Sequence, residues 1–507
     1  MDVPTLRKGT LGTADIAFFV ISAAAPLTVM AGVAPIAIML GGIGAPVGYL
    51  LAGVTLAIFA IGFTTMSRHV RSGGAFYAYI TRGLGRPVGI AAALIAMLGY
   101  NGMEIGVYGL LGSTTADTVQ ALWGIDIPWL PVSLAGLLLI WYGGFRSIDF
   151  GAKVLGVLLD GGADGISFAS FTPGNVLVPG TAAVLACAFA AFTGFESTVI
   201  YRREARNPDR TVPRATYIAV AFLGLFYAFI VWTVVQAFGD ANVVEAAATD
   251  PGGLFFSAIT HYVGPWAADL MHILIVTSVL ASLLAFHNAI NRYGLALSEE
   301  GVLPEALGRV HPRHHSPYVA GLAQIALGAV ILIAFAAAGA DPYAQLLLWV
   351  NTPGMLGLML LQLLAAIAVP LFFRRFEHGE GRFRTVVAPV VAAVLLAAAI
   401  LLVTDHVDLF SGASTGVNIV LVSLVPAVFL IGLALAHRLK RDKPEVYARF
   451  AAEPSPPDPV TTPAAPSSTT VQGVPPCPQP TSSSPEPVSA PSTRTGRKPP
   501  PWRSRTG

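Results

Sequence analysis

The segment of residues 182–215 reads AAVLACAFAAFTGFESTVIYRREARNPDRTVPRA. It begins as an apolar segment typical of a membrane helix, passes through Gly194 and Glu196, and ends in a basic loop bounded by prolines. A glycine and a carboxylate inside such a segment cost free energy in lipid, because backbone groups and a charge must find partners there. Intramembrane ionisable residues usually face a cavity or a partner, which favours a functional role for Glu196. The alternative is a kinked helix in which Glu196 is buried and hydrogen-bonded.

The composition of the whole chain indicates a polytopic membrane protein. Its 507 residues are 54% hydrophobic and only 11% charged, whereas a soluble chain carries about 25% charged residues. The basic residues behind the net charge of +2 lie in loops rather than on one face, so no nucleic-acid partner is expected. Cys187 lies in a predicted helix and Cys477 near the C-terminus, which excludes a disulfide framework.

Apolar segments long enough to cross a bilayer recur along the chain. Between residues 153 and 180 the pattern is irregular. The predicted membrane helices are Thr13–Leu40, Pro46–Met66, Pro87–Gly112, Pro128–Tyr142, Thr181–Tyr201, Arg214–Phe238, Trp266–Tyr293, Tyr318–Ala338, Tyr343–Pro370, Thr385–Thr404 and Thr415–His437.

Lysine and arginine occupy alternate connections between these segments. They precede the first helix and follow those that end at residues 66, 142, 201, 293, 370 and 437. The other connections contain none, at residues 41–45, 113–127, 239–265, 339–341 and 405–414. The positive-inside rule therefore predicts cytoplasmic N- and C-termini in a multi-pass protein of the plasma membrane.

The sequence predicts three regions. Residues 1–12 form a cytoplasmic N-terminus, residues 13–440 a transmembrane domain, and residues 441–507 a cytoplasmic tail. The tail is rich in proline, serine and threonine and cannot bury a core, so disorder is predicted. The N-terminal residues show no apolar stretch followed by a small-residue cleavage site, so the first helix is predicted to be retained.

Motifs for catalysis or cofactor binding do not emerge from the sequence. His311, His314 and His315 lie on a proline-flanked loop without fixed helical spacing, which favours a solvated loop over a metal site. Gly83-Leu84-Gly85 does not follow a strand, so it is not a dinucleotide fingerprint. We therefore expect neither an enzyme nor a bound cofactor.

The opening stretch closely resembles the amino acid–polyamine–organocation (APC) permease family, in particular bacterial amino acid permeases. The likeness runs from about Thr10 to about Arg441, and Arg203 departs from it by standing where members often have an acid. The matching motifs are Gly194-Phe195-Glu196-Ser197, Glu204-Ala205-Arg206-Asn207-Pro208, Val212-Pro213-Arg214-Ala215, Asn291-Arg292-Tyr293 and Glu300-Gly301-Val302-Leu303-Pro304. Gly73–Tyr79 resembles the family's loop between the second and third helices, which implies a gate.

The resemblance implies an all-α polytopic membrane protein with a leucine-transporter-like 5+5 inverted repeat and two further C-terminal helices. Such a protein is a secondary active transporter, with alternating access around broken first and sixth helices. In this chain Pro26 and Gly32 interrupt residues 13–40, while Thr193–Glu196 interrupt residues 181–201. Half-helix N-termini suit a carboxylate and unwound carbonyls suit an ammonium, so an amino acid substrate fits both breaks.

By resemblance, the substrate site collects residues from four helices. The first break, Ala25-Pro26-Leu27-Thr28-Val29, would hold the carboxylate, and carbonyls of Phe192, Thr193 and Gly194 the amino group, with Glu196 close by. Phe192 is either a gate or core packing. The helix 87–112 adds Tyr100, Asn101 and Glu104, and the helix 266–293 adds Ser282. Glu104 would bind a cationic group or carry a proton; a buried neutral glutamate is the alternative.

The coupling ion is expected to be H+ rather than Na+, unless the protein is an exchanger. In sodium-coupled relatives of this fold, hydroxyls on the eighth helix help to ligate the ion. Here Ala281 precedes Ser282, so one hydroxyl of a potential pair is absent.

The fifth helix of the family is shortened in this chain. Only Val154–Leu159 are apolar before Asp160, and six residues rise about 9 Å as a helix against a bilayer core of about 30 Å. We expect an irregular crossing over residues 154–178. In some relatives this helix bears an ionisable residue linked to proton coupling. Alternatives to amino acid transport are therefore amine or polyamine transport by the same fold, or a non-transporting sensor or defective paralogue.

Overall fold

The computed structural model describes residues 11–70, 74–143, 166–312, 316–375 and 378–451. Apart from an isolated bridge between Leu11 and Ala205, the regular elements in these ranges are helices. Nine helical stretches of the described chain are long and apolar enough to cross a bilayer. The predicted all-α polytopic membrane protein is thus confirmed.

Most predicted spans form one long helix each, while the segments 13–40 and 181–201 are broken. The unbroken helices are α4 (Ala45–His69), α6 (Arg86–Trp123), α7 (Trp129–Gly143), α10 (Pro208–Phe238), α13 (Pro265–Glu299), α14 (Tyr318–Ala337), α15 (Leu348–Phe373), α16 (Ala388–Asp405) and α18 (Thr415–Asp442). The broken ones are α1 (Thr13–Ala24), α2 (Pro26–Ala31) and α3 (Ala34–Gly41), and then α9 (Thr181–Ala191) with the 3-10 helix η3 (Phe195–Glu204).

The predicted end of the helix 87–112 is wrong, because α6 continues to Trp123. The hydroxyls of Thr114 and Thr118 bond at 2.7 Å to carbonyls one turn earlier, so both side chains are satisfied within the helix. The first residue that ends the helix is Gly124, with a left-handed φ of 67°. Residues 113–123, predicted as a connection, are therefore helical.

Several other connections contain short helices. The predicted gate loop holds α5 (Ala75–Leu84), and the connection at 239–265 holds α11 (Val243–Thr249) and α12 (Leu254–Tyr262). Residues 441–451, at the start of the predicted tail, form the end of α18 and α19 (Pro444–Arg449).

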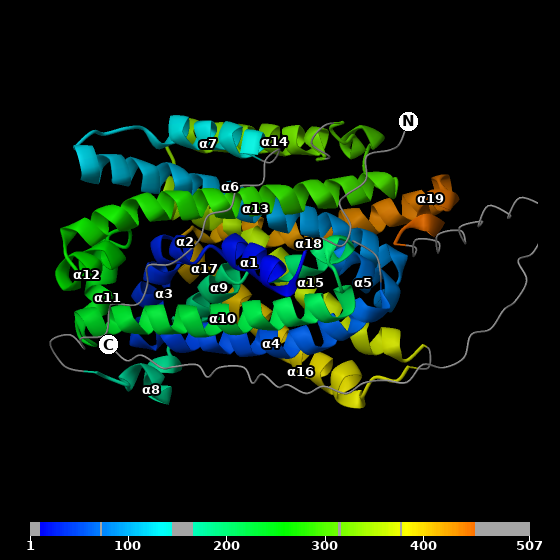
Figure 1. Cartoon of the computed structure of the whole chain (residues 1–507), viewed down its shortest axis with the longest axis horizontal. Helices are drawn as coiled ribbons and strands as arrows, with labels where there is room; N and C mark the ends of the chain where they lie inside the picture. Colours follow the sequence, from blue (N-terminus) through cyan, green and yellow to red (C-terminus); the bar gives the residue numbers. More distant parts are fainter. Residues whose placement is uncertain (1–10, 71–73, 144–165, 313–315, 376–377, 452–507) are drawn as a thin grey trace, which may run out of the picture. The chain divides into compact units, whose positions relative to one another are not determined.

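The long helices form a bundle in which α6 packs against α7, α13, α14, α15 and α18. In Figure 1, α4 and α10 lie side by side below α9, while α6 and α13 run above it. Small residues allow close approach: a Cβ placed on Gly354 of α15 would lie 3.1 Å from the Gly99 carbonyl oxygen of α6. The broken helices α1–α3 and α9 therefore lie in the middle of the bundle.

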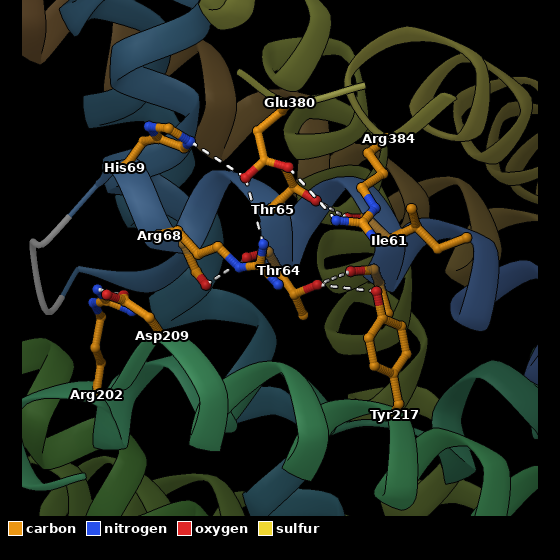
Figure 2. A network of polar contacts seen from close by, with 12 residues as sticks. Ile61, Thr64, Thr65, Arg68, His69, Arg202, Asp209, Tyr217, Glu380 and Arg384 are labelled. Carbon is orange, nitrogen blue, oxygen red and sulfur yellow. Dashed lines mark hydrogen bonds and ion pairs between the residues drawn. The ribbon is translucent and has the colours of Figure 1, made fainter. Parts of the chain in front are cut away.

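A polar network lies at the C-terminal end of α4 (Figure 2). The carboxylate of Glu380 lies 3.4 Å from Arg68, 3.8 Å from the His69 ring nitrogen and 3.6 Å from Arg384. It ties α4 to the segment that precedes α16. This end of the bundle carries the arginines that the charge pattern assigns to the cytoplasm.

At the same end, α19 packs on α5 and on the residues that follow α13. The Phe450 ring stacks on Tyr77 with centroids 5.4 Å apart, and Arg86 donates to the Ala448 carbonyl at 2.8 Å. A Cβ on Gly301 would lie 2.9 Å from a Val446 methyl group. The segment 444–451 is therefore part of the folded bundle.

Residues 166–180 lie at the opposite end of α4 and at the C-terminal end of α10. The Ser167 N–H donates to Gln236 and its hydroxyl to Asp240, both at 2.6 Å. The backbone of Asn175 packs directly on Gly44, immediately before α4. The predicted short fifth helix, Val154–Leu159, lies outside the described residues.

Candidate functional site

The first broken helix is interrupted twice. α1 ends at Ala24, and Ala25 adopts a left-handed φ of 39° before Pro26 begins α2. A positive φ strains a non-glycine residue, whereas proline fits the first position of a helix because it needs no N–H partner there. The second interruption, at Gly32 and Val33, precedes α3. The N–H groups of Thr28 and Val29 both bond to the Ala25 carbonyl, at 2.8 and 3.3 Å, so they are satisfied within the break.

The second broken helix changes direction at Gly194. α9 ends at Ala191, and Gly194 has a φ of 108°, a conformation open to glycine at no steric cost. The chain then continues as the 3-10 helix η3. The Gly194 carbonyl accepts hydrogen bonds from the N–H and the hydroxyl of Ser197, at 3.0 and 2.6 Å. That carbonyl is therefore already occupied.

Two tyrosines satisfy carbonyls that the breaks leave free of helical partners. The Tyr227 hydroxyl of α10 lies 3.1 Å from the Ala24 carbonyl and 3.3 Å from the Ala191 carbonyl. It thus joins the last residues of α1 and α9. The Tyr343 hydroxyl donates to the Gly32 carbonyl at 2.6 Å. These contacts hold both broken helices against α10, and the first one also against the residues that directly precede α15.

A small cavity of about 50 Å³ lies between the two breaks, enough for a few water molecules. Four predicted site residues line it: Thr28, Val29, Thr193 and Ser282. Apolar residues form most of the remaining wall, among them Met103, Val107, Leu110, Ala190, Ala191 and Phe286. No acidic or basic side chain occurs among the described residues that line the cavity. Ala25, Pro26, Leu27 and Gly194 belong to the breaks but are not part of the wall.

Glu196 is completely buried and is not part of the cavity wall. One carboxylate oxygen accepts the Tyr100 hydroxyl at 2.5 Å, and the other accepts the Gly194 N–H at 3.2 Å. Tyr100 therefore contributes to the site indirectly, by holding the carboxylate that fixes the turn at Gly194. This arrangement matches the alternative given in the sequence analysis, a kinked helix in which Glu196 is buried and hydrogen-bonded.

Glu104 is also completely buried, between α6, α13 and α14. Its carboxylate accepts from the Tyr108 hydroxyl at 3.3 Å and from the Gln324 amide, and it lies 3.8 Å from His287 Nδ1. Asn101, one turn away, donates to the Met97 carbonyl of its own helix at 2.8 Å. Neither residue lines the cavity.

Phe192 is buried in the bundle core. Its ring meets Tyr227 edge-on with centroids 5.8 Å apart and lies next to Gly53 of α4 and Gly224 of α10. In this structure it packs away from the cavity, as in the core-packing alternative.

Helix α13, predicted as Trp266–Tyr293, brings serine hydroxyls to the first break and the cavity. Ser278 lies 3.4 Å from the Thr28 hydroxyl, and Ser282 lines the cavity one turn further along α13. No cluster of three or more His, Cys, Asp or Glu side chains able to hold a metal occurs in the described residues.

The sequence analysis missed Asn351, His287 and Gln324. Asn351 adds a polar group to the cavity wall from α15, and the other two contact Glu104. Each is a polar residue inside a strongly apolar segment. The same signal drew attention to Glu196 in the sequence analysis, and it could have drawn attention to these three residues as well. Their common position near the breaks depends on tertiary packing and carries no local signature.

Comparison with known proteins identifies the family. The profile of a family described as "Amino acid permease" matches residues 119–429, more than half of the chain. The chain belongs to the amino acid permease family of the APC superfamily. This permease is therefore a membrane transporter rather than an enzyme, as predicted.

Its curated relatives carry transporter names. An uncharacterized transporter of Mycobacterium tuberculosis is 28% identical over 346 residues, which cover 58% of this chain and 67% of the relative. The L-lysine transport protein of Corynebacterium glutamicum is 27% identical over 314 residues, covering 56% and 61%. The low-affinity putrescine importer of Escherichia coli is 23% identical over 330 residues, covering 57% and 66%. Two of these three relatives are thus named for a substrate, L-lysine in one case and putrescine in the other.

Proposed function

We propose that this permease is a secondary active transporter of small neutral amino acids across the plasma membrane, coupled to protons or working by exchange. The observation that supports this proposal best is the uncharged cavity between the two broken helices. Thr28, Thr193 and Ser282 bring hydroxyl groups to its wall, and a hydroxyl can donate to the carboxylate or accept from the ammonium of a zwitterion. Alternating access would open this cavity to each side in turn.

The walls of the cavity favour a small apolar side chain on the substrate. Met103, Val107, Leu110 and Phe286 surround it with methyl, methylene and ring carbons. A volume of about 50 Å³ leaves little room for a long side chain in this conformation. Alanine, serine and glycine fit these limits best.

Amines form the second candidate class, because one relative is named a putrescine importer. A diamine bears two positive charges, and burying them requires carboxylates or several carbonyls. Neither of the buried glutamates Glu104 and Glu196 lines the cavity, and both are hydrogen-bonded elsewhere. The geometry therefore favours amino acids over diamines.

The charge pattern supports an orientation with both termini in the cytoplasm. The arginine-rich ends of α4, η3 and α15 would face inside, together with the network around Glu380. The connection that holds α11 and α12 contains no lysine or arginine and would face outside.

Uptake into proteoliposomes tests this proposal. Radiolabelled alanine, lysine and putrescine are compared for saturable, competable uptake and for counterflow against the same unlabelled compound. We expect alanine to be transported, with competition by serine and glycine. Saturable uptake of putrescine alone would favour the amine class. Alanine that stabilises the purified protein against heat without being transported would instead indicate a sensor.

A further inference from the structure

A second polar cluster lies behind the wall of the cavity, in the seam between α6, α13 and α14. It consists of Glu104, Tyr108, His287 and Gln324, whose exposed fractions are 0, 1, 2 and 7%. Gln324 and Tyr108 donate to different oxygens of the Glu104 carboxylate, and His287 Nδ1 lies 3.8 Å from the oxygen that Tyr108 contacts. An acid and a base thus face each other within the membrane part of the fold.

On α6 and on α13, a residue of the cavity wall and a residue of the cluster are neighbours in the sequence. Met103 and Phe286 line the cavity, and Glu104 and His287 follow them directly in sequence. Successive residues of an α-helix point about 100° apart, because a turn takes about 3.6 residues. Glu104 and His287 therefore point from α6 and α13 toward α14 instead of into the cavity. Any change in their interaction acts on α6 and α13, two of the helices that contribute residues to the cavity wall.

The hydrogen bonding of the cluster is incomplete. Among the described residues, no hydrogen-bond partner reaches His287 Nδ1 or Gln324 Oε1, although both atoms are buried. A proton between His287 Nδ1 and Glu104 would give that nitrogen a partner after a movement of less than about 1 Å, since a hydrogen bond spans about 2.7–3.2 Å. Without that proton, the buried negative charge of Glu104 would be stabilised only by the neutral donors Tyr108 and Gln324. An unpaired charge of this kind costs free energy inside a membrane.

Other charged groups lie too far along the helices to replace this pair. α7 and α15, which also pack on α6, contain no acidic or basic residue, and α14 contributes only the neutral Gln324 near Glu104. On α13, Asp269 and Glu299 stand near the two ends of the helix, His272 contacts Thr118, and Arg292 lies over the Tyr201 ring at 4.5 Å. α5 carries Arg82 in its last turn, and α18 carries its charges in the last two turns. The titratable groups that face Glu104 are thus Tyr108 and His287.

We propose that Glu104 and His287 form a proton-binding pair that couples transport to the proton gradient. This inference rests on the proposed transport function and adds the coupling site to it. One proton enters from the outside solution, binds to the pair and neutralises it, and is released to the cytoplasm as the carrier returns. The pair alternates between net charges of −1 and 0, so a zwitterionic substrate would move with one positive charge.

The test separates coupling from transport itself. Wild-type proteoliposomes with the membrane potential clamped are given an inward proton gradient of one pH unit, and accumulation of radiolabelled alanine is measured. One coupled proton supports an accumulation ratio of up to about tenfold, because one pH unit is about 1.36 kcal/mol. Counterflow of alanine at equal pH on both sides is measured in the same vesicles, since it needs no net proton movement.

We expect Glu104→Gln and His287→Gln to lower the accumulation ratio from about tenfold to about 1 while counterflow continues. His272→Gln, on the same helix but outside the cluster, is expected to accumulate alanine like the wild type. Either cluster variant that still accumulates alanine tenfold would overturn the proton pair. So would a wild type that shows counterflow but no response to the gradient. Absence of counterflow in the wild type would overturn the transport function itself.

Recovery of each variant as a monodisperse protein is checked before reconstitution. If Glu104→Gln does not fold, His287→Gln decides, because its side chain makes the fewer hydrogen bonds in the cluster. Glu104→Asp keeps the carboxylate but shortens the side chain, whereas Glu104→Gln keeps the length but loses the carboxylate. We expect the Asp variant to recover part of the accumulation that the Gln variant loses. If only the length of the side chain mattered, the Gln variant would be the better of the two.

Discussion

Substitution of Tyr227 by phenylalanine tests how the two broken helices are held together. The hydroxyl lies 3.1 Å from the Ala24 carbonyl and 3.3 Å from the Ala191 carbonyl, the last residues of α1 and α9. The ring is 2% exposed and stays packed against Phe192, so the substitution removes the hydrogen bonds and little else. Any loss of stability then reports on the carbonyls at the breaks.

The expected loss in the free energy of unfolding is about 1–3 kcal/mol. A buried carbonyl left without a donor costs about this much, whereas a typical hydrogen bond contributes about 1 kcal/mol net. We do not double the figure for two carbonyls, because one hydroxyl hydrogen serves only one of them at a time.

Tyr49→Phe provides a matched control. Tyr49 is fully buried, and its ring meets Tyr227 edge-on with centroids 5.8 Å apart. Its hydroxyl has no hydrogen-bond partner within the described part of the chain. Removal of such a group is expected to be neutral or stabilising. Both variants are unfolded by heat and by denaturant in the same detergent, and a Tyr227→Phe protein as stable as Tyr49→Phe would refute the reasoning.

Three further predictions follow from the breaks, the topology and the network of Figure 2. Gly194→Leu, at a φ of 108°, is expected to abolish alanine binding in a thermal-shift titration while the protein stays in the membrane; Gly174→Leu, with open space around it, is the control, and retained affinity would make the Gly194 turn structural only. With Cys187 and Cys477 replaced, single cysteines at positions 149, 174 and 207 are expected to be labelled from inside, outside and inside, respectively. Labelling of position 207 from outside would show that the second half of the protein has the opposite orientation to the one predicted. Glu380→Gln is expected to lower stability by about 1 kcal/mol or less, because its ion pairs are partly exposed; a loss above about 3 kcal/mol in denaturant unfolding would show that the network is more strongly coupled.

The breaks in the helices could be predicted from the sequence because their causes are local. Pro26 cannot continue a helical hydrogen-bond pattern, and Gly194 permits a positive φ within an apolar segment. The Glu196 carboxylate drew attention to the second break for the same local reason. The cavity between the breaks, lined by Thr28 and Thr193, agrees with the pairing of the two segments.

The directions of the side chains could not be predicted, because they depend on helices far apart in the sequence. Glu104 turns toward α14 since Gln324 donates to it there, and Phe192 fills the space beside two glycines of α4 and α10. The end of α6 was missed because threonines that disfavour helices can bond back to carbonyls of their own helix. Residues 144–165, where the fifth helix was expected, lie outside the described structure.

The packing of α19 has a practical consequence for work with this permease. Residues 444–451 pack against α5 and the start of α6. Phe450 stacks on Tyr77, and Arg86 donates a hydrogen bond to the Ala448 carbonyl. A truncation after Asp442 would remove this segment, and a fluorescent fusion placed there would displace it; either would expose the Tyr77 ring to water. The same cut made after Ala451 leaves every one of these contacts in place. The boundary of the folded unit, for crystallisation or for reporter fusions, is therefore better set after α19 than at the last membrane helix.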